Sequence, residues 1–174
     1  MKRLIYIVLL CGTSGLGGYM TSSSATVAAQ GQPPQTQNTV PVVEGKGIYW
    51  SADDLKKTHT AGASIPLPRT ATYNTQLIKR APQAKPPSSE LHTNRAQLFV
   101  MVGGSGTVVV GGEAQNSAEI SRGEPRGKPG EPLKGGTAYK VKTGDMLLIP
   151  AKTWHVTQPD PGGVTYFLVN LMEP

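Results

Sequence analysis

The sequence is poor in cysteine: among its 174 residues only Cys11 carries a thiol. This residue lies in an N-terminal stretch that we expect to be removed, and the remaining chain would then contain no thiol. A disulfide framework, a thiolate metal ligand and a cysteine nucleophile are therefore excluded. An exported domain without cross-links draws its stability from a packed core instead.

Charged residues are also few, at 16% of the chain, and they form no cluster of one sign. Of the 17 basic side chains, Lys2 and Arg3 fall in the N-terminal stretch, and the other 15 against 11 acidic ones give a net charge of +4. Because no basic stripe interleaved with aromatic residues occurs, we expect no nucleic-acid partner. The sequence also lacks a Ser-His-Asp arrangement, a phosphate-cradling loop and a dinucleotide fingerprint.

Residues 1–29 have the three parts of a secretory signal peptide. A basic start at Lys2 and Arg3 precedes the apolar run 4–10, and the small residues Val27 and Ala29 stand at the positions that cleavage requires. We predict cleavage after Ala29 and export to the periplasm or the cell exterior. The apolar stretch is too short and too rich in glycine for a good membrane-spanning helix, which needs about 20 apolar residues. We expect no stable membrane span after cleavage, and a retained N-terminal anchor is the alternative.

The rest of the chain divides into a tether and one domain. Residues 30–45 are rich in proline and glutamine, and such a polar segment cannot bury enough apolar surface to fold, which predicts a flexible tether. Residues 46–174 are predicted to form a single folded domain. Within it, the segment Ser51–Lys57 is expected to be a short helix with Ser51 as its N-cap. His59 follows this helix and is interpreted as a solvated loop histidine.

Short apolar runs separated by Gly, Pro or Asp dominate the domain and indicate an all-β sandwich or barrel. No long stretch with helical periodicity competes with them. Residues 111–136 interrupt the pattern and predict a long excursion between two strands. The predicted strands are Tyr73–Arg80, Gln97–Val102, Thr107–Val110, Thr137–Lys142, Met146–Ile149, His155–Thr157 and Val164–Leu171.

Three residues are the candidate metal ligands. Glu90 and His92 are two positions apart, so on an extended strand both side chains point to the same face. His155 follows a turn and begins another strand. One carboxylate and two imidazoles can form a three-ligand site with open coordination positions. The expected ion is a divalent transition metal, Fe(II), Mn(II), Ni(II), Cu(II) or Zn(II), which this ligand set does not distinguish.

Two segments of the chain resemble the motifs of the cupin superfamily. The first runs from Glu90 through His92 and Gln97 to Gly104, and the second runs from Gly144-Asp145 through Pro150 to His155. The resemblance covers about residues 73–171. It implies a double-stranded β-helix, or jelly-roll barrel, here preceded by the short helix, with a metal held by motif residues.

The chain departs from the family pattern at two ligand positions. Glu90 replaces a histidine and Gln97 replaces a glutamate, so the carboxylate has moved to another position. Gln97 is then a candidate fourth ligand, or a hydrogen-bonding group behind the ligands. The alternative is a barrel without metal, in which Glu90 and His92 form a buried hydrogen-bonded pair.

Other residues have weaker interpretations. Four large side chains are candidates for the wall of a ligand pocket or for the barrel core: Phe99, Met101, Trp154 and Tyr166. For Trp154, strand alternation also allows an outward orientation. Asp145 is interpreted as a turn residue. Arg95 is interpreted as a solvated loop residue rather than as a group that binds an anionic substrate.

These observations favour a metal-binding, cupin-type barrel that acts on or binds a small molecule in the cell envelope. The resemblance implies dioxygenase, isomerase or lyase chemistry without ranking them, because this fold serves many functions. The alternatives are a non-catalytic barrel that binds a small ligand and an oligomerising barrel without metal. A homodimer is compatible with each of these functions.

Overall fold

The computed structural model describes residues 39–120 and 124–173. The predicted signal peptide and residues 30–38 of the predicted tether lie outside the described residues. The elements are β1 (Thr39–Val40), α1 (Ala52–Thr60), β2 (Leu67–Pro68), β3 (Tyr73–Arg80), β4 (Arg95–Val110), β5 (Ser117–Ile120), β6 (Glu124–Gly127), β7 (Thr137–Lys142), β8 (Met146–Ile149) and β9 (His155–Met172). The prediction of an all-β domain with one short helix before it is confirmed. The helix of the described residues is also too short to cross a membrane.

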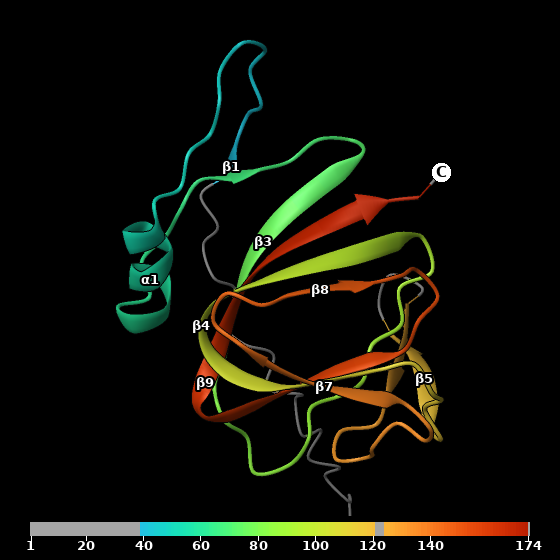
Figure 1. Cartoon of the computed structure of the whole chain (residues 1–174). Coiled ribbons are helices and arrows are strands. Elements are labelled where there is room, and N and C mark those ends of the chain that lie inside the picture. Colours follow the sequence, from blue (N-terminus) through green and yellow to red (C-terminus); the bar gives the residue numbers. More distant parts are fainter. Residues whose placement is uncertain (1–38, 121–123, 174) are drawn as a thin grey trace, which may run out of the picture. The chain divides into compact units, whose positions relative to one another are not determined.

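The long strands β4 and β9 pair with each other along both of their halves (Figure 1). The first half of β4 and the second half of β9 lie in one antiparallel sheet, in the order β3-β9-β4-β8. The second half of β4 and the first half of β9 continue into another sheet, in which β7 lies at the far side of β4. Both strands thus pass from one sheet to the other, which is how a jelly roll joins its two layers.

Each strand bends where it changes sheets. The β4–β9 pairing shifts register between Met101 and Gly103 and again between Gly104 and Gly106. Gly104 has a φ of 74°, and a Cβ there would lie 2.0 Å from the carbonyl oxygen of Gly163. Only glycine tolerates both the backbone conformation and the close approach. The sequence predicted a turn at these glycines, and the structure shows continuous, bulged strands instead.

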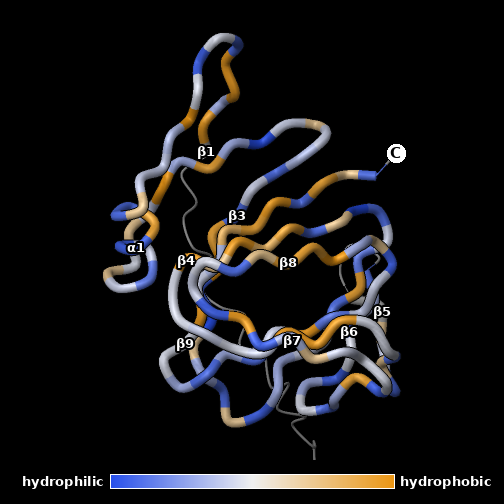
Figure 2. The backbone as a smooth tube through the Cα atoms, in the orientation of Figure 1, coloured by the Kyte–Doolittle hydropathy of each residue, from blue (hydrophilic) through white to orange (hydrophobic). Residues whose placement is uncertain are grey.

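The main core lies on the faces of the two sheets that point toward each other. Side chains from both halves of β4, for example Phe99 and Val108, belong to one buried cluster. Figure 2 shows that hydrophobic residues concentrate in β3, β4, β8 and β9. The cluster comprises Phe99, Met101, Val108, Val141, Ile149, Val164, Tyr166 and Leu168.

A second apolar cluster covers the outer face of the first sheet. Leu77 on β3 and Val102 on β4 pack there against Ile65, Leu67 and the partly buried Trp50. These contacts attach the N-terminal segment that contains α1 and β2 to the sheet. The segment therefore belongs to the domain.

The helix α1 begins as the sequence predicted. Ser51 is the N-cap, and its side-chain oxygen accepts a hydrogen bond of 3.1 Å from the backbone N–H of Asp54. The helix continues to Thr60, however, so His59 lies in its last turn. The interpretation of His59 as a solvated loop residue is wrong, because its ring packs against Gly103 and its Nδ1 lies 2.9 Å from the hydroxyl of Thr165.

The long excursion between β4 and β7 is also present, and it carries structure of its own. It contains the antiparallel pair β5 and β6. Residue 126 of β6 forms a bridge to Glu90. The excursion is thus attached to the segment that contains two of the predicted ligands.

Candidate metal centre

Backbone pairing fixes the position of Glu90. Its N–H donates to the carbonyl of His155 at 2.8 Å, and the N–H of His155 donates back to Glu90 at 2.9 Å. On its other side Glu90 is bridged to Arg126 of β6. Residues directly opposite each other on antiparallel strands present their side chains on the same face. Arg126, Glu90 and His155 are therefore placed next to one another by the strand register.

His92 completes the predicted triad. It lies two residues after Glu90, and its carbonyl accepts a hydrogen bond of 2.6 Å from Lys152 in the turn before His155. One potential ligand atom from each of Glu90, His92 and His155 lies within 4.8 Å of the others. The two imidazole rings are buried, at 5% and 4% exposed. The structure therefore brings together the three residues that the sequence singled out.

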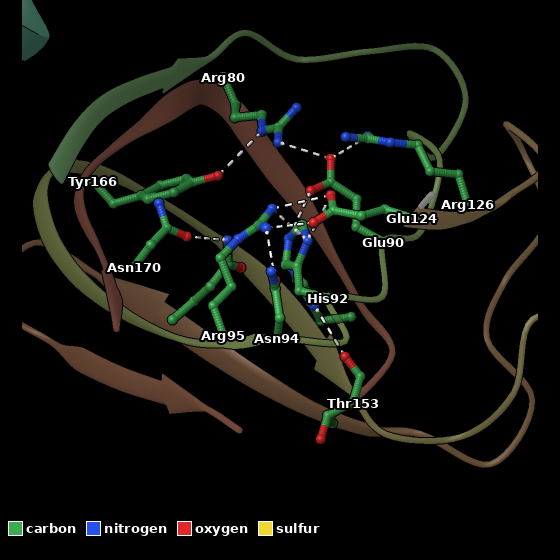
Figure 3. A network of polar contacts seen from close by, with 12 residues as sticks. Arg80, Glu90, His92, Asn94, Arg95, Glu124, Arg126, Thr153, Tyr166 and Asn170 are labelled. Atoms are coloured by element: carbon green, nitrogen blue, oxygen red, sulfur yellow. Dashed lines mark hydrogen bonds and ion pairs between the residues drawn. The ribbon is translucent and has the colours of Figure 1, made fainter. Parts of the chain in front are cut away.

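The two carboxylate oxygens of Glu90 face different groups (Figure 3). Oε2 lies 3.5 Å from Nε2 of His92. Oε1 accepts from Arg126 and lies 3.7 Å from the guanidinium of Arg80. Burial alone would raise the pKa of Glu90, but the nearby ring of His92 and the charges of Arg126 and Arg80 together lower it well below its usual range. Glu90 is therefore ionised at neutral pH.

The orientation of His92 is set by an ion pair between Glu124 and Arg95. Nδ1 of His92 lies 3.1 Å from Oε2 of Glu124 and 2.7 Å from a terminal nitrogen of Arg95. The guanidinium of Arg95 already donates to both oxygens of Glu124, whereas Glu124 offers His92 an acceptor. Nδ1 can thus accept from Arg95 when it carries no proton or donate to Glu124 when it does, and the second form, which leaves a lone pair on Nε2, is the one that a metal requires.

His155 is held in a similar way by the backbone. Its Nδ1 lies 3.3 Å from the carbonyl oxygen of Thr153, which can only accept, so the proton belongs on Nδ1 and Nε2 keeps its lone pair. Burial lowers the pKa of His155 to about 4, although the charge of Glu90 opposes this shift. The ring is neutral at pH 7. Phe99 packs edge-on against it at a centroid distance of 6.2 Å.

The triad has the properties that a metal site requires. Metal binding needs neutral imidazoles and an ionised carboxylate, and the pKa shifts of His155 and Glu90 are in those directions. The Nε2 atom of His92 is buried and has no hydrogen-bond partner among the described residues. A buried polar atom without a partner is costly, and a cation between Nε2 and the carboxylate would remove that cost. The residues present thus fit a divalent ion.

Gln97, the candidate fourth ligand, belongs to a buried chain of amides. Its Nε2 donates to Asn170 at 2.9 Å, and Asn170 donates to Asn74 at 2.7 Å. This chain fixes the amide so that Oε1 is free, and in the described residues that buried oxygen has no hydrogen-bond partner. The role of Gln97 toward a metal stays a prediction.

The four predicted pocket residues take different positions. Phe99 and Tyr166 stack on each other with centroids 4.4 Å apart. Met101 is buried in the same core cluster. Trp154 is half-buried beside His155. Asp145 is a turn residue as predicted, since its carboxylate accepts from the N–H of Lys142 at 2.9 Å.

Sequence reasoning missed three charged residues near the triad: Arg80, Glu124 and Arg126. Glu124 and Arg126 lie two apart on β6, and this spacing was the signal that could have paired them on one face. The interpretation of Arg95 as a solvated loop residue is wrong. It begins β4, and its side chain, 21% exposed, is ion-paired with Glu124.

The two segments that resemble cupin motifs are adjacent in space, because Glu90 of the first pairs with His155 of the second. They lie in an antiparallel jelly roll whose layers share β4 and β9. This arrangement is the jelly-roll barrel that the sequence predicted. No family model and no curated protein sequence matches the chain.

Solved structures similar in fold to this chain include three bacterial proteins. A cupin protein from Bacteroides fragilis shares 10% identity at a TM-score of 0.42, covering 59% of this chain and 68% of that one. The DMSP lyase DddQ from Ruegeria pomeroyi shares 8% at 0.41, covering 63% and 42%. A protein from Bacillus halodurans shares 16% at 0.48, covering 75% and 86%. At these identities the likeness concerns the fold alone.

Proposed function

We propose that the chain is a metal-binding, cupin-type barrel protein that acts on or binds a small molecule in the cell envelope. Glu90, His92 and His155 would hold one divalent ion. The observation that carries the proposal is the Nε2 atom of His92, which is buried without a hydrogen-bond partner 3.5 Å from the carboxylate of Glu90. Two imidazoles and one carboxylate suit Fe(II), Mn(II), Ni(II), Cu(II) or Zn(II).

The surrounding residues prepare the three ligands. With an ion bound, Glu124 would accept the Nδ1 proton of His92 and the Thr153 carbonyl would accept that of His155, so that both Nε2 atoms act as lone-pair donors. Arg126 occupies the other oxygen of Glu90. A bound ion would supply Lewis acidity toward a ligand oxygen. The protein supplies the ligand orientation and the buried surroundings.

Metal analysis of the purified protein and of two variants tests this proposal. His92→Ala and His155→Ala should each lose most of the bound metal, because each removes one of the three protein ligands. His59→Ala is the matched control, since it removes a half-buried imidazole that contacts Gly103 and Thr165 rather than the triad. Undiminished metal in both triad variants, or equal loss in the control, would contradict the site.

The N-terminal pattern supports the proposed location. A basic start, an apolar run and small residues at Val27 and Ala29 are the features that export machinery reads. Mass spectrometry of the protein from a cell-envelope fraction should find a chain that begins at Gln30. A chain that begins at Met1 would contradict export with cleavage.

A metal-free ligand-binding barrel is the second candidate. The observation that favours it is the pair of guanidiniums, from Arg80 and Arg126, that already compensates the charge of Glu90. In that case the purified protein contains no stoichiometric ion and gains no thermal stability from added Zn(II) or Mn(II). A metal-binding protein would be stabilised in proportion to the logarithm of free metal concentration above the dissociation constant.

A homodimer is the remaining part of the proposal. Met146 and Leu148 project from β8 and are 64% and 57% exposed, and apolar side chains grouped on one strand are a common feature of interfaces. Met146→Glu with Leu148→Glu should shift the protein toward a monomer in size-exclusion chromatography with light scattering. A wild-type protein that is already monomeric at high concentration would contradict this part.

A further inference from the structure

The charges around the triad do not balance. Glu124 is paired with Arg95, and these two charges cancel. Glu90, by contrast, faces two guanidiniums, those of Arg80 and Arg126. The Glu90 carboxylate with its two arginines therefore carries one excess positive charge. A divalent ion would raise the excess to three.

The two guanidiniums come from different parts of the fold and meet at one oxygen. Arg80 is the last residue of β3, and Arg126 belongs to β6. Figure 3 shows them approaching Oε1 of Glu90 from two sides, while Oε2 faces His92. Oε1 of Glu90 thus contacts the two arginines, and Oε2 is left to coordinate the metal. The arginines can therefore stay in place when the triad binds an ion.

Arg80 has more hydrogen-bonding capacity than the described residues use. Its Nε donates to the hydroxyl of Tyr166 at 3.2 Å, which fixes the plane of the guanidinium. Its distance of 3.7 Å from Glu90 exceeds a normal hydrogen bond. A guanidinium has five N–H donors in a fork that matches a carboxylate. Arg80 thus presents an oriented donor pair without a full acceptor.

Both arginines are also accessible to a molecule from solution. The side chain of Arg80 is 26% exposed and that of Arg126 is 35% exposed. A purely structural role for Glu90 would require one guanidinium, since one positive charge balances one carboxylate. The second guanidinium is partly buried without a carboxylate of its own. An anion bound beside it would offset the cost of its desolvation.

We propose that the molecule taken by this site is a small carboxylate, whose anionic group lies against Arg80 and Arg126 beside the triad. The inference rests on the proposed function in one respect, since it names the substrate class of that same site. The carboxylate accepts hydrogen bonds from the two guanidiniums and neutralises the excess charge. A neutral molecule of the same shape leaves both donor groups unfilled and binds weakly.

Isothermal titration calorimetry of the metal-free protein with oxalate tests the inference without involving a metal. Oxamide is the matched neutral probe, and inorganic phosphate is the competing anion. We expect oxalate to bind at least tenfold more tightly than oxamide and more tightly than phosphate. Arg80→Gln and Arg126→Gln should each weaken oxalate binding about 10- to 100-fold, the range for a charge-assisted contact. Arg69→Gln, which alters an exposed arginine elsewhere, should leave it unchanged.

The outcomes separate this inference from the metal proposal. Metal binding together with oxalate binding that neither Arg80→Gln nor Arg126→Gln weakens would overturn the carboxylate site and leave the metal centre intact. Oxalate binding that both variants weaken, without any metal, supports the carboxylate site alone. Tighter binding of phosphate than of oxalate would overturn the assignment to carboxylates. If Arg80→Gln unfolds, the more exposed Arg126→Gln decides the result.

Discussion

The contact between Glu124 and His92 allows a quantitative test of how the metal centre is prepared. Glu124→Gln keeps the shape of the side chain and removes its charge. In the tautomer that binds metal, the carboxylate accepts the Nδ1 proton of His92 at 3.1 Å. In the variant the acceptor is weaker, and the guanidinium of Arg95, 2.7 Å from Nδ1, favours the form in which Nδ1 carries no proton and accepts from the guanidinium. The proton would then move to Nε2, the atom that the metal needs.

The size of the effect follows from the bond that is lost. A hydrogen bond to a charged group contributes about 1.5–3 kcal/mol and a neutral one about 0.5–1.5 kcal/mol, so the charge alone accounts for about 1–1.5 kcal/mol. The change of tautomer adds to this loss. We expect Zn(II) affinity to fall about 10- to 100-fold, the range found when the partner of a ligating histidine is removed.

Chelator competition with Zn(II) measures the affinity directly. Arg95→Gln is the control, because it removes the competing donor and leaves Glu124 as the acceptor for His92. Its Zn(II) affinity should stay within about threefold of the native value, by the same hydrogen-bond reasoning. An unchanged affinity in Glu124→Gln would refute the reasoning. An equal loss of Zn(II) affinity in both variants would show that the metal centre depends on the ion pair as a whole rather than on the hydrogen bond from His92 to Glu124.

Three further predictions concern stability. Gly104→Ala should destabilise the protein by clearly more than Gly144→Ala in urea unfolding, since both have positive φ but only Gly104 has backbone within 4 Å of the added Cβ; equal losses would contradict the close packing. Burial lowers the pKa of His155 from 6.5 to about 4, so in the metal-free protein its contribution to the free energy of unfolding is complete above pH 6.5 and falls by about 3 kcal/mol as the pH is lowered to 4. The free energy of unfolding of His155→Asn should fall less over the same range. Gln97→Glu should cost the metal-free protein about 1–3 kcal/mol, because it replaces the donor to Asn170 by a buried charge; an unchanged unfolding midpoint would contradict this.

Much of the fold was predictable from the sequence because its strands are short apolar runs. The predicted bounds of β3, β7 and β8 match those observed. β4 and β9 were each predicted as two strands, since residues 103–106 of β4 and 158–163 of β9 have the composition of turns. Pairing with a long neighbouring strand lets such a segment continue as a bulged strand, and local composition does not contain that information.

The site was predictable in part for a similar reason. Glu90, His92 and His155 belong to recognisable motifs, and the structure brings them together. The charged residues around them were missed because the strand β6, Glu124–Gly127, consists of charged residues, proline and glycine. Such a segment has little strand propensity of its own. It pairs because the segment around Glu90 offers an unpaired edge, which is a property of the tertiary fold.

The central place of β9 has a consequence for how the chain acquires its structure. Tyr73 pairs with Leu171 and Arg95 pairs with Met172, so the first sheet joins strands that are far apart in sequence. A protein with mostly non-local pairing folds slowly, on a scale of milliseconds to seconds. The same strand supplies His155 at its other end. Formation of the ligand set and closure of the barrel should therefore be one kinetic event, with no early intermediate able to capture metal through all three ligands.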